Sequence, residues 1–268
     1  MARNLQLVSV VVPTYNERDN LPALVAGIDK HITTDYEIIV VDDGSPDGTA
    51  DVARELATEY PVRLLSRGAK LGLGSAYRAG FRLARGDAVL EMDADLSHDP
   101  RHIPGLLEAV ERGASMAVGS RYVHGGAIRN WGPYRKVVSG VGNGLARTIL
   151  GLGSKDCTSG FRCYAADWKH LVTSTKSDGY AFQVEVLYLA KKWGATVAEV
   201  PIIFENRTVG KSKLGASEFG KFLATLGRLR VSSMPAMPPA LPTGPTATLE
   251  AGVEAPAAQS QEASAPSQ

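Results

Sequence analysis

The sequence predicts an α/β fold, a mostly parallel, Rossmann-like sheet flanked by helices, followed by C-terminal amphipathic helices and a disordered tail. Two observations predict this fold. Short apolar runs rich in β-branched residues alternate with longer segments that repeat apolar residues at helical spacing. Polar clusters also follow three of the apolar runs directly. Ligands of parallel sheets bind at the carboxyl ends of the strands, so these clusters indicate where a site would lie.

The predicted strands and helices alternate through the first half of the chain. Strands are expected at 7–13, 36–41, 62–66, 87–92 and 115–119, and helices at 17–31, 46–60, 74–85 and 100–112. The strand segments are short and continuously apolar, as in strands that are buried on both faces. Asp47 and Asp51 stand near the start of the second helix, where the helix dipole favours acidic residues. This alternation favours parallel strands whose connecting helices cover both faces of the sheet.

The pattern changes after Gly119. Amphipathic helices are expected at 134–151 and 215–231, with a loop at 153–160, a helix at 182–194 and a strand at 198–205 between them. Residues 1–231 are therefore predicted to form one domain. Residues 232–268 are rich in Ala, Pro, Ser and Thr and have almost no large apolar periodicity. Such a segment buries too little surface to offset its ordering entropy, so we expect a disordered tail.

Composition and charge set broad limits on the function. The formal net charge is +1, which gives no indication of nucleic-acid binding. Cys157 and Cys163 could pair, bind a metal or do neither, and reduced thiols in a cytosolic protein are the interpretation we favour. The sequence shows no signal-peptide core and no apolar run near the ~20 residues of a spanning helix. We expect a cytoplasmic protein that contacts a membrane peripherally, on its cytoplasmic face.

The three polar clusters are Pro13-Thr14-Tyr15-Asn16-Glu17, Asp42-Asp43-Gly44-Ser45 and Asp93-Ala94-Asp95. Each follows a predicted strand of the same parallel sheet, so a shared site explains their positions better than their local sequence does. A carboxylate of the Asp42-Asp43 pair can accept hydrogen bonds from a base N–H and a ribose hydroxyl. The alternative for this pair is an Asx turn before Gly44.

The Asp93-Ala94-Asp95 triplet indicates a divalent metal beside a diphosphate. Mg²⁺ and Mn²⁺ prefer oxygen ligands and keep substrate phosphates in their coordination shell. Two carboxylates separated by one small residue also supply the negative charge that such an ion needs. The alternative is a pair of solvated turn acids that cap the next helix. The triplet alone leaves both interpretations open.

Basic residues follow later in the chain. Arg121 closes the fifth predicted strand, where a guanidinium suits a bidentate phosphate clamp. The other candidates are Arg129, Arg135, Lys136, Arg207, Lys211 and Lys213. Isolated Arg and Lys residues are usually solvated surface, so their spacing alone does not separate the two possibilities.

Taken together, the motifs resemble a family-2 glycosyltransferase of the GT-A fold, and more closely the dolichol-phosphate and polyprenol-phosphate mannosyltransferases. The resemblance covers about residues 7–230. The matching segments, in order, are VVVPTYNERDNLP, YEIIVVDDGSPDGTADV, GLGSAYRAGF, EMDADLSHDP, GSRYVHGG, DCTSGFRCY, DGYAFQVEV and EVPIIFENRTVGKSKLG.

The resemblance implies roles for individual residues. The guanosine of a GDP-sugar would be held by Pro13, Tyr15, Glu17, Val40 and Asp42, with Asp43 beside them. Asp93 and Ala94 would line the sugar-diphosphate, and Asp95 and Ser97 would ligate Mg²⁺ or Mn²⁺, with Asp93 as a further metal candidate. Some relatives carry Gln where this chain has Ser97, and Ser is a weaker ligand. Arg121, Arg135 and Ser139 would meet a lipid phosphate. Arg207 and Lys213 would close over the diphosphate from a loop hinged at Gly210 and Gly215.

The implied reaction is an inverting transfer of mannose from GDP-mannose to a polyprenyl (dolichyl) monophosphate, with Asp95 and Arg121 as catalytic residues. The acceptor is already anionic, so it needs charge stabilisation and not a strong base. Transfer of another sugar, for instance glucose from UDP-glucose, is the nearest alternative. A nucleotidyltransferase would carry a Gly-rich loop after the first strand, which 13–17 lack. A non-catalytic binding subunit is the third alternative, and a membrane-anchoring partner protein is left open.

Two amphipathic stripes suggest contact with the membrane that holds the acceptor. One consists of Phe219, Phe222, Leu223, Leu226 and Leu229, with Lys221, Arg228 and Arg230 nearby, and the other lies in residues 137–150. Such helices can lie in the headgroup plane. The alternative is that both stripes pack on the sheet, which is the commoner arrangement for an amphipathic helix.

Overall fold

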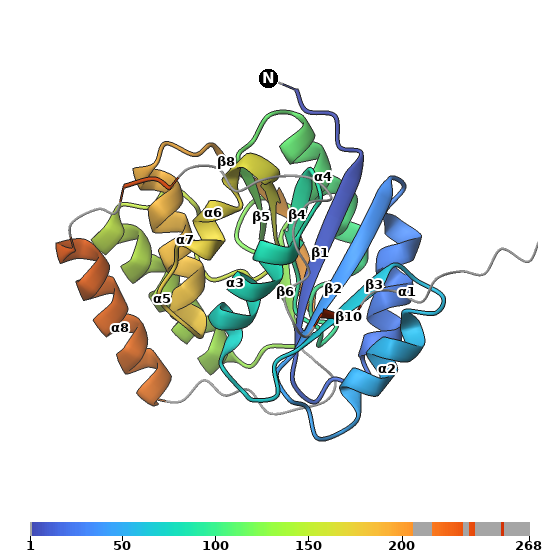
Figure 1. The fold of residues 1–268 in the computed structure, drawn as a ribbon. Helices are drawn as coiled ribbons and strands as arrows, with labels where there is room; N and C mark the ends of the chain where they lie inside the picture. The colour runs from blue at the N-terminus through green and yellow to red at the C-terminus, as the bar shows by residue number, and fades with distance from the viewer. Residues whose placement is uncertain (1, 206–215, 233–235, 239–252, 255–268) are drawn as a thin grey trace, which may run out of the picture.

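The structure is a computed structural model, and it describes residues 2–205, 216–232, 236–238 and 253–254 (Figure 1). Its strands are β1 (Leu7–Thr14), β2 (Asp35–Asp42), β3 (Val62–Ser66), β4 (Ala88–Glu91), β5 (Met116–Ser120), β6 (Ala127–Arg129), β7 (Arg162–Ala165), β8 (Val197–Pro201), β9 (Ile203–Glu205) and β10 (Val253–Glu254). Its α-helices are α1 (Leu21–His31), α2 (Thr49–Leu56), α3 (Leu73–Leu83), α4 (Ile103–Glu111), α5 (Pro133–Leu150), α6 (His170–Thr173), α7 (Tyr180–Lys192) and α8 (Ala216–Val231), with 3₁₀ turns η1 (Pro100–His102) and η2 (Ala166–Trp168).

The strands form an eight-stranded sheet in the order β10-β3-β2-β1-β4-β7-β5-β8, and β6 pairs with β9 separately. Strand β1 lies at the centre and pairs in parallel with β2 and with β4. Strand β2 pairs in parallel with β3, and β5 with β8. The prediction of a mostly parallel sheet flanked by helices is therefore confirmed.

Strand β7 is an interior strand of the main sheet that the sequence did not predict. It runs antiparallel between β4 and β5, where a purely alternating pattern would have placed a parallel strand. Its sequence, Arg-Cys-Tyr-Ala, is only four residues long and begins with a charged residue, so it forms no apolar run. The insertion brings Arg162 into the centre of the sheet, fully buried, and this residue contributes to the site described below.

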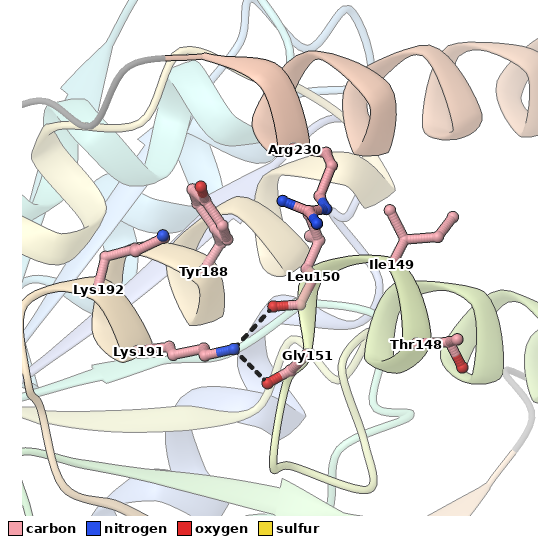
Figure 2. Close-up of a pocket in the computed structure, with 8 residues that line it drawn as sticks. All are labelled: Thr148, Ile149, Leu150, Gly151, Tyr188, Lys191, Lys192 and Arg230. Carbon is pink, nitrogen blue, oxygen red and sulfur yellow. Dashed lines mark hydrogen bonds between the residues drawn. The ribbon is translucent and has the colours of Figure 1, made fainter.

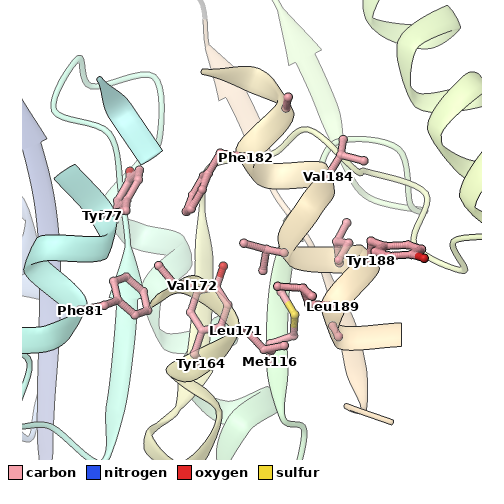
Figure 3. Close-up of a cluster of buried hydrophobic side chains, with 14 of the residues drawn as sticks. Tyr77, Phe81, Met116, Tyr164, Leu171, Val172, Phe182, Val184, Tyr188 and Leu189 are labelled. Atoms are coloured by element: carbon pink, nitrogen blue, oxygen red, sulfur yellow. The ribbon is translucent and has the colours of Figure 1, made fainter. Parts of the chain in front are cut away.

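Two cores sandwich the sheet. On one face, Val10, Val12 and the other alternate residues of the central strands pack against helices α1, α2 and α4. On the other face, Val11, Ile39 and Val41 pack against helices α3, α5, α6, α7 and α8. Figure 3 shows part of this second core, where the ring of Tyr77 from α3 lies stacked 5.7 Å from that of Phe182 from α7. Side chains of consecutive strand residues point to opposite faces, which explains the two sets.

The predicted helices differ from the observed ones mainly at their first turns. The helix expected at 17–31 begins at Leu21, and the one expected at 46–60 covers Thr49–Leu56. Asp47 precedes this second helix, and its Oδ1 accepts hydrogen bonds from the backbone N–H and the hydroxyl of Thr49. Acceptors at this position satisfy amides that have no partner within the helix, so Asp47 favours its start.

The C-terminal helices pack on the protein through one of the two stripes considered above. Phe222, Leu226 and Leu229 of α8 are buried in the core shared with α5 and α7. Arg228 ties α8 to α7, because its guanidinium donates to Glu185 at 3.2 Å and to the Ser177 hydroxyl at 2.7 Å. Three residues of the predicted stripe therefore form core, while Leu223 is exposed and the Phe219 side chain lies outside the described part of the structure.

The predicted tail, residues 232–268, lies mostly outside the described residues. Within it, Val253–Glu254 pair antiparallel with Leu64 and Leu65 at the edge of the sheet. No helix in the described part of the chain is long and apolar enough to cross a bilayer. Cys157 and Cys163 are both buried and free, so the disulfide considered from the sequence does not form.

Candidate functional site

The three polar clusters lie together at the carboxyl edge of the sheet. The register pairs Thr14 of β1 with Asp42 of β2, and the Thr14 hydroxyl donates to Asp42 Oδ1 at 3.0 Å. On the other side of β1, Val11 pairs with Glu91 of β4, which places Asp93 just past the end of that strand. The prediction that the clusters share one edge is therefore confirmed, and it follows from the parallel order β2-β1-β4.

The Asp42 and Asp43 carboxylates are held by the protein itself. Asp42 is buried, its Oδ1 accepts from the hydroxyls of Thr14 and Ser45, and its Oδ2 accepts from the Ser45 backbone N–H at 3.0 Å. Asp43 is also buried and receives the guanidinium of Arg67, with Nε at 2.7 Å. These contacts match the Asx-turn alternative, in which the carboxylates build the turn.

The turn also positions a loop beside the edge. Gly44 has φ +72°, and a Cβ there would approach the Gly68 carbonyl carbon to 2.9 Å. Asp43 Oδ2 accepts hydrogen bonds from the backbone N–H groups of Leu71 and Gly72, at 3.1 and 3.3 Å. The loop 67–72 is thus fastened to the turn, and this tight packing requires glycine at position 44.

The other residues predicted to hold guanosine differ in their accessibility. Tyr15 is exposed, and the Lys70 ammonium lies 3.6 Å from the centroid of its ring. Glu17 is half-buried and accepts a hydrogen bond from the Asn20 amide at 2.7 Å. Pro13 is also half-buried at this edge. Val40, in contrast, has no exposed surface and lies in the core with α1, so its side chain faces away from the edge.

Asp93 is the accessible carboxylate at the centre of the edge. Its side chain is 36% exposed, and its Oδ1 accepts a hydrogen bond from the hydroxyl of the fully buried Tyr77 at 2.9 Å. A Cβ at Gly160 would lie 3.3 Å from Asp93 Oδ2, so glycine at that position lets the 157–161 segment pass close to the carboxylate. Neither Tyr77 nor Gly160 was singled out from the sequence, because their roles depend on contacts between distant segments.

The residues after Asp93 form a tight turn and not a helix cap. Asp95 Oδ1 accepts from the backbone N–H of Ser97 at 3.1 Å, and Leu96 between them has φ +60°. Ala94 and Ser97 are buried. The following helical turn, η1, is capped by Asp99, whose side chain accepts from Arg101 N–H. The helix-capping alternative therefore fails for Asp93 and Asp95, because Asp99 caps this turn.

His98 is a further member of the edge that the sequence analysis did not identify. Its Nδ1 lies 4.0 Å from Asp93 Oδ2, and its ring stacks on Phe161 at 5.2 Å. Burial lowers the pKa of His98 to about 4, against the opposing effect of the Asp95 charge. The imidazole is therefore neutral at pH 7, and it adds no positive charge beside the two carboxylates.

A buried polar network supports Asp93 from below. Glu91, on the same strand, accepts from the Tyr164 hydroxyl at 2.9 Å and from the Gln183 amide. Burial raises the pKa of Glu91 to about 7, although the charge of Arg162 opposes this rise. Arg162 itself donates to the carbonyl of Gln183 at 2.9 Å and to that of Cys157 at 3.2 Å. These bonds join β4, β7, α7 and the 157–161 segment immediately beneath the site.

Arg121 lies at the end of β5, as predicted, but its guanidinium is paired within the protein. Its Nε and Nη2 both contact the Asp156 carboxylate at 2.7 Å, and Nη2 also donates to the Thr158 hydroxyl at 2.9 Å. Burial opposes ionisation of Asp156, but the Arg121 charge and hydrogen bonds hold its pKa below the ordinary range. This bidentate pair is buried, so much of the Arg121 charge is neutralised before any ligand binds.

The first turns of α5 bring Arg135 and Ser139 next to Arg121. The Ser139 and Tyr122 hydroxyls lie 2.9 Å apart, and the Arg135 guanidinium lies 4.1 Å from the centroid of the Trp131 ring. The Arg121 guanidinium lies 5.5 Å from the centroid of the same ring. The three residues predicted to meet a lipid phosphate therefore lie together, with Tyr122 and Trp131 beside them.

Aromatic contacts connect this group to the carboxylates. Phe204 of β9 packs edge-on against Trp131 at 5.5 Å and against His98 at 5.3 Å. The acidic and basic groups thus flank one short aromatic wall. Arg207 and Lys213, which were predicted to close over a diphosphate, lie outside the described residues.

Comparison with known proteins gives consistent matches. Residues 9–169 match the model of glycosyl transferase family 2. A polyprenol monophosphomannose synthase of Mycolicibacterium smegmatis is 46% identical over 222 residues, which cover 80% of this chain and 83% of that protein. An undecaprenyl-phosphate mannosyltransferase of Micrococcus luteus is 43% identical over 227 residues, or 82% of this chain and 93% of that protein.

Solved structures show the same fold at lower identity. A glucosyl-3-phosphoglycerate synthase from Mycobacterium tuberculosis, in complex with Mn²⁺, uridine diphosphate and glucosyl-3-phosphoglycerate, superposes with a TM-score of 0.61. It is 24% identical, and the match covers 84% of this chain and 80% of that one. This likeness supports the GT-A architecture.

Proposed function

The chain belongs to glycosyl transferase family 2, and we propose that it transfers mannose from GDP-mannose to the phosphate of a polyprenol. The two similar proteins described above carry the names of polyprenol-phosphate mannose transferases, and they match this chain along four-fifths of its length. The geometric observation that carries the proposal is the grouping of side chains at the carboxyl edge of the sheet. The accessible Asp93 and Asp95 turn stands at the end of a central strand, next to the Arg121, Arg135 and Ser139 group.

The donor is proposed to bind over the ends of β1 and β2. Pro13, Tyr15 and Glu17 are the half-buried or exposed residues there, so they are the ones proposed to contact guanosine directly. Asp42 and Asp43 contribute by holding the turn and the 67–72 loop in place. Val40 acts through the core beneath them. Arg207 and Lys213 remain proposed partners of the leaving diphosphate.

The residues at the end of β4 fit a divalent metal. Asp93 and Asp95 offer only oxygen donors, the ligands that Mg²⁺ and Mn²⁺ prefer. The described residues contain no group of three or more His, Cys, Asp or Glu side chains arranged for a metal. Two carboxylates completed by substrate phosphates are nevertheless a usual Mg²⁺ arrangement. Ser97 is buried and its N–H donates to Asp95, so it holds the turn, and its hydroxyl stays a proposed further ligand. When bound, the metal would neutralise charge on the diphosphate.

The acceptor phosphate is proposed to meet Arg135 and Ser139 at the start of α5. Arg121 is already paired with Asp156, so we propose that it positions Thr158 and Trp131 as much as it attracts the anion. An acceptor oxygen then attacks the anomeric carbon, the bond to GDP breaks, and the electron pair leaves with GDP. This single displacement inverts the anomeric configuration and requires no covalent enzyme intermediate.

The membrane contact is proposed to use the outer faces of α5 and α8. Val137 and Val141 of α5 are 63% and 49% exposed, and Leu223 of α8 is also exposed. The exposed Lys136 and Lys221 lie beside them and would attract anionic headgroups. We expect Val137→Asp to reduce flotation with anionic liposomes, while Val197→Asp, at an exposed valine of β8, leaves it unchanged. Equal flotation of both variants and the wild type would contradict this membrane face.

A donor-competition assay tests the function. The protein is incubated with polyprenyl phosphate, Mg²⁺ or Mn²⁺, and radiolabelled GDP-mannose, UDP-glucose or UDP-GlcNAc, and the lipid-extractable label is counted. We expect label only from GDP-mannose and an at least tenfold loss in Asp95→Ala, about 1.4 kcal/mol of barrier. Asp35→Ala serves as the control, because Asp35 is an exposed acid at the opposite end of β2. Label from UDP-glucose alone would establish the alternative sugar, and full activity of Asp95→Ala would refute the metal role.

A further inference from the structure

A basic pocket lies where three helices end, away from the site just described. It has a volume of about 270 Å³ and is lined by the last turns of α5, α7 and α8 (Figure 2). Helix α5 begins beside Arg135 and Ser139, and its final turn, with Thr148, reaches this pocket. A helix rises about 1.5 Å per residue, so most of the length of α5 separates the two places.

The lining contains three cations and no acid. Lys191, Lys192 and Arg230 all face the pocket, and none of them is paired with a carboxylate in the described part of the chain. Lys191 donates from Nζ to the carbonyls of Leu150 and Gly151, at 3.0 and 2.7 Å, which closes the end of α5. Figure 2 shows Lys192 and Arg230 on either side of Tyr188.

The helix ends do not account for all of this charge. Each helix C-terminus carries about half a negative charge, so three such ends offset roughly half of the three positive charges. Lys191 is the cation engaged with helix carbonyls. Lys192 and Arg230, together with the Tyr188 hydroxyl, therefore leave the pocket positive and rich in hydrogen-bond donors.

We propose that this pocket binds a phosphate-bearing anion. A phosphate needs donors and compensating charge, and a guanidinium, an ammonium and a phenol supply both. The pocket volume accommodates a phosphate with a small ester group. Two sources carry this chemistry, a phospholipid headgroup and a soluble phosphate ester. Val231, next to Arg230, is 83% exposed, which would allow an acyl chain to continue from a bound headgroup.

The test compares the double variant Lys192→Gln/Arg230→Gln with Lys30→Gln. Lys30 is an exposed lysine in the last turn of α1, so it matches the helix-end setting without the pocket. Inorganic phosphate is titrated while the amide resonances of Thr148 and Gly151 are followed by NMR. In parallel, co-sedimentation is measured with vesicles of phosphatidylglycerol mixed with phosphatidylcholine, and with phosphatidylcholine alone.

We expect the double variant to lose about 25-fold in anion affinity, since each cation near an anionic surface contributes about fivefold. Lys30→Gln should bind as the wild type does. Pocket shifts with free phosphate, lost in the double variant, support a soluble ester. Loss of phosphatidylglycerol binding without phosphate shifts supports a headgroup. If neither probe distinguishes the double variant from Lys30→Gln, the pocket is not an anion site. Transfer to a detergent-solubilised acceptor should be unchanged in all three proteins, which separates this site from the catalytic edge.

Discussion

Removing one hydroxyl beneath Asp93 gives a direct test of how the candidate metal site is positioned. Tyr77 is fully buried, and its hydroxyl donates to Asp93 Oδ1 at 2.9 Å. In Tyr77→Phe the ring keeps its stacking on Phe182 and its edge contact with Phe81, so the core stays filled. The substitution therefore changes the orientation of the Asp93 carboxylate and little else.

The expected size of the effect follows from the type of contact. Loss of an outer-shell partner of a metal ligand lowers metal affinity about 10- to 100-fold. Asp93 is one-third exposed, so water can replace part of the lost hydrogen bond. We therefore expect a value near the lower end, about tenfold weaker Mn²⁺ binding in the presence of GDP.

Calorimetric or EPR titration measures the Mn²⁺ affinity directly and independently of turnover. Tyr36→Phe is the matched control, because the Tyr36 hydroxyl donates to Asp29 at 2.6 Å on the surface, at the other end of the sheet. Equal Mn²⁺ affinity in Tyr77→Phe, Tyr36→Phe and the wild type would refute the idea that Asp93 serves the metal. Equal loss in both variants would point to a general effect on the fold.

Two further predictions concern the buried charges. Asp156→Asn leaves the Arg121 guanidinium buried without its partner, so the free energy of unfolding should fall by about 3–5 kcal/mol in urea denaturation. Asp51→Asn is the control: Asp51 forms an exposed ion pair, so its loss should change the free energy of unfolding by less than about 1 kcal/mol. An equally small change in Asp156→Asn would contradict the buried ion pair. Burial raises the pKa of Glu91 from its ordinary value of 4.5 to about 7 in the folded protein, so Glu91 binds its proton more tightly when folded. The resulting contribution to the free energy of unfolding is fully present below pH 4.5 and is lost as the pH rises through 7. Across that window the free energy of unfolding of the wild type should fall by about 3 kcal/mol relative to that of Glu91→Gln. A difference between the two proteins that does not change with pH would contradict the raised pKa.

The positions of the parallel strands along the chain were predictable because each leaves a continuous apolar run. The run over residues 7–13 became β1, and 36–41 became β2, each within one or two residues. Strand β7 was not predictable on that basis, since Arg162 opens it and its pairing partners lie far away in sequence. Its antiparallel direction depends on the tertiary arrangement and not on a local pattern.

The candidate site was predictable where it lies directly after a strand. Asp93, Asp95 and Arg121 follow strands as predicted, because a strand end is visible in the sequence. The side chains that pair with them were not predictable, because Tyr77, which bonds Asp93, and Asp156, which bonds Arg121, come from other segments. A carboxylate and its buried partner separated by many residues leave no local signal, and only the folded contacts reveal them.

The contrast between the two halves of the edge indicates where ligand charge would be met. The carboxylates of Asp42 and Asp43 are already satisfied by turn hydroxyls, amides and Arg67, so they cannot change partners without opening the turn. Asp93 is instead partly exposed, and its Oδ1 accepts a hydrogen bond from the Tyr77 hydroxyl. Because a satisfied, buried charge is costly to disturb, we propose that a cation arriving with a diphosphate is met at the more exposed Asp93. For the same reason we propose that Arg121, whose charge is already balanced by Asp156, is less available to an anionic acceptor.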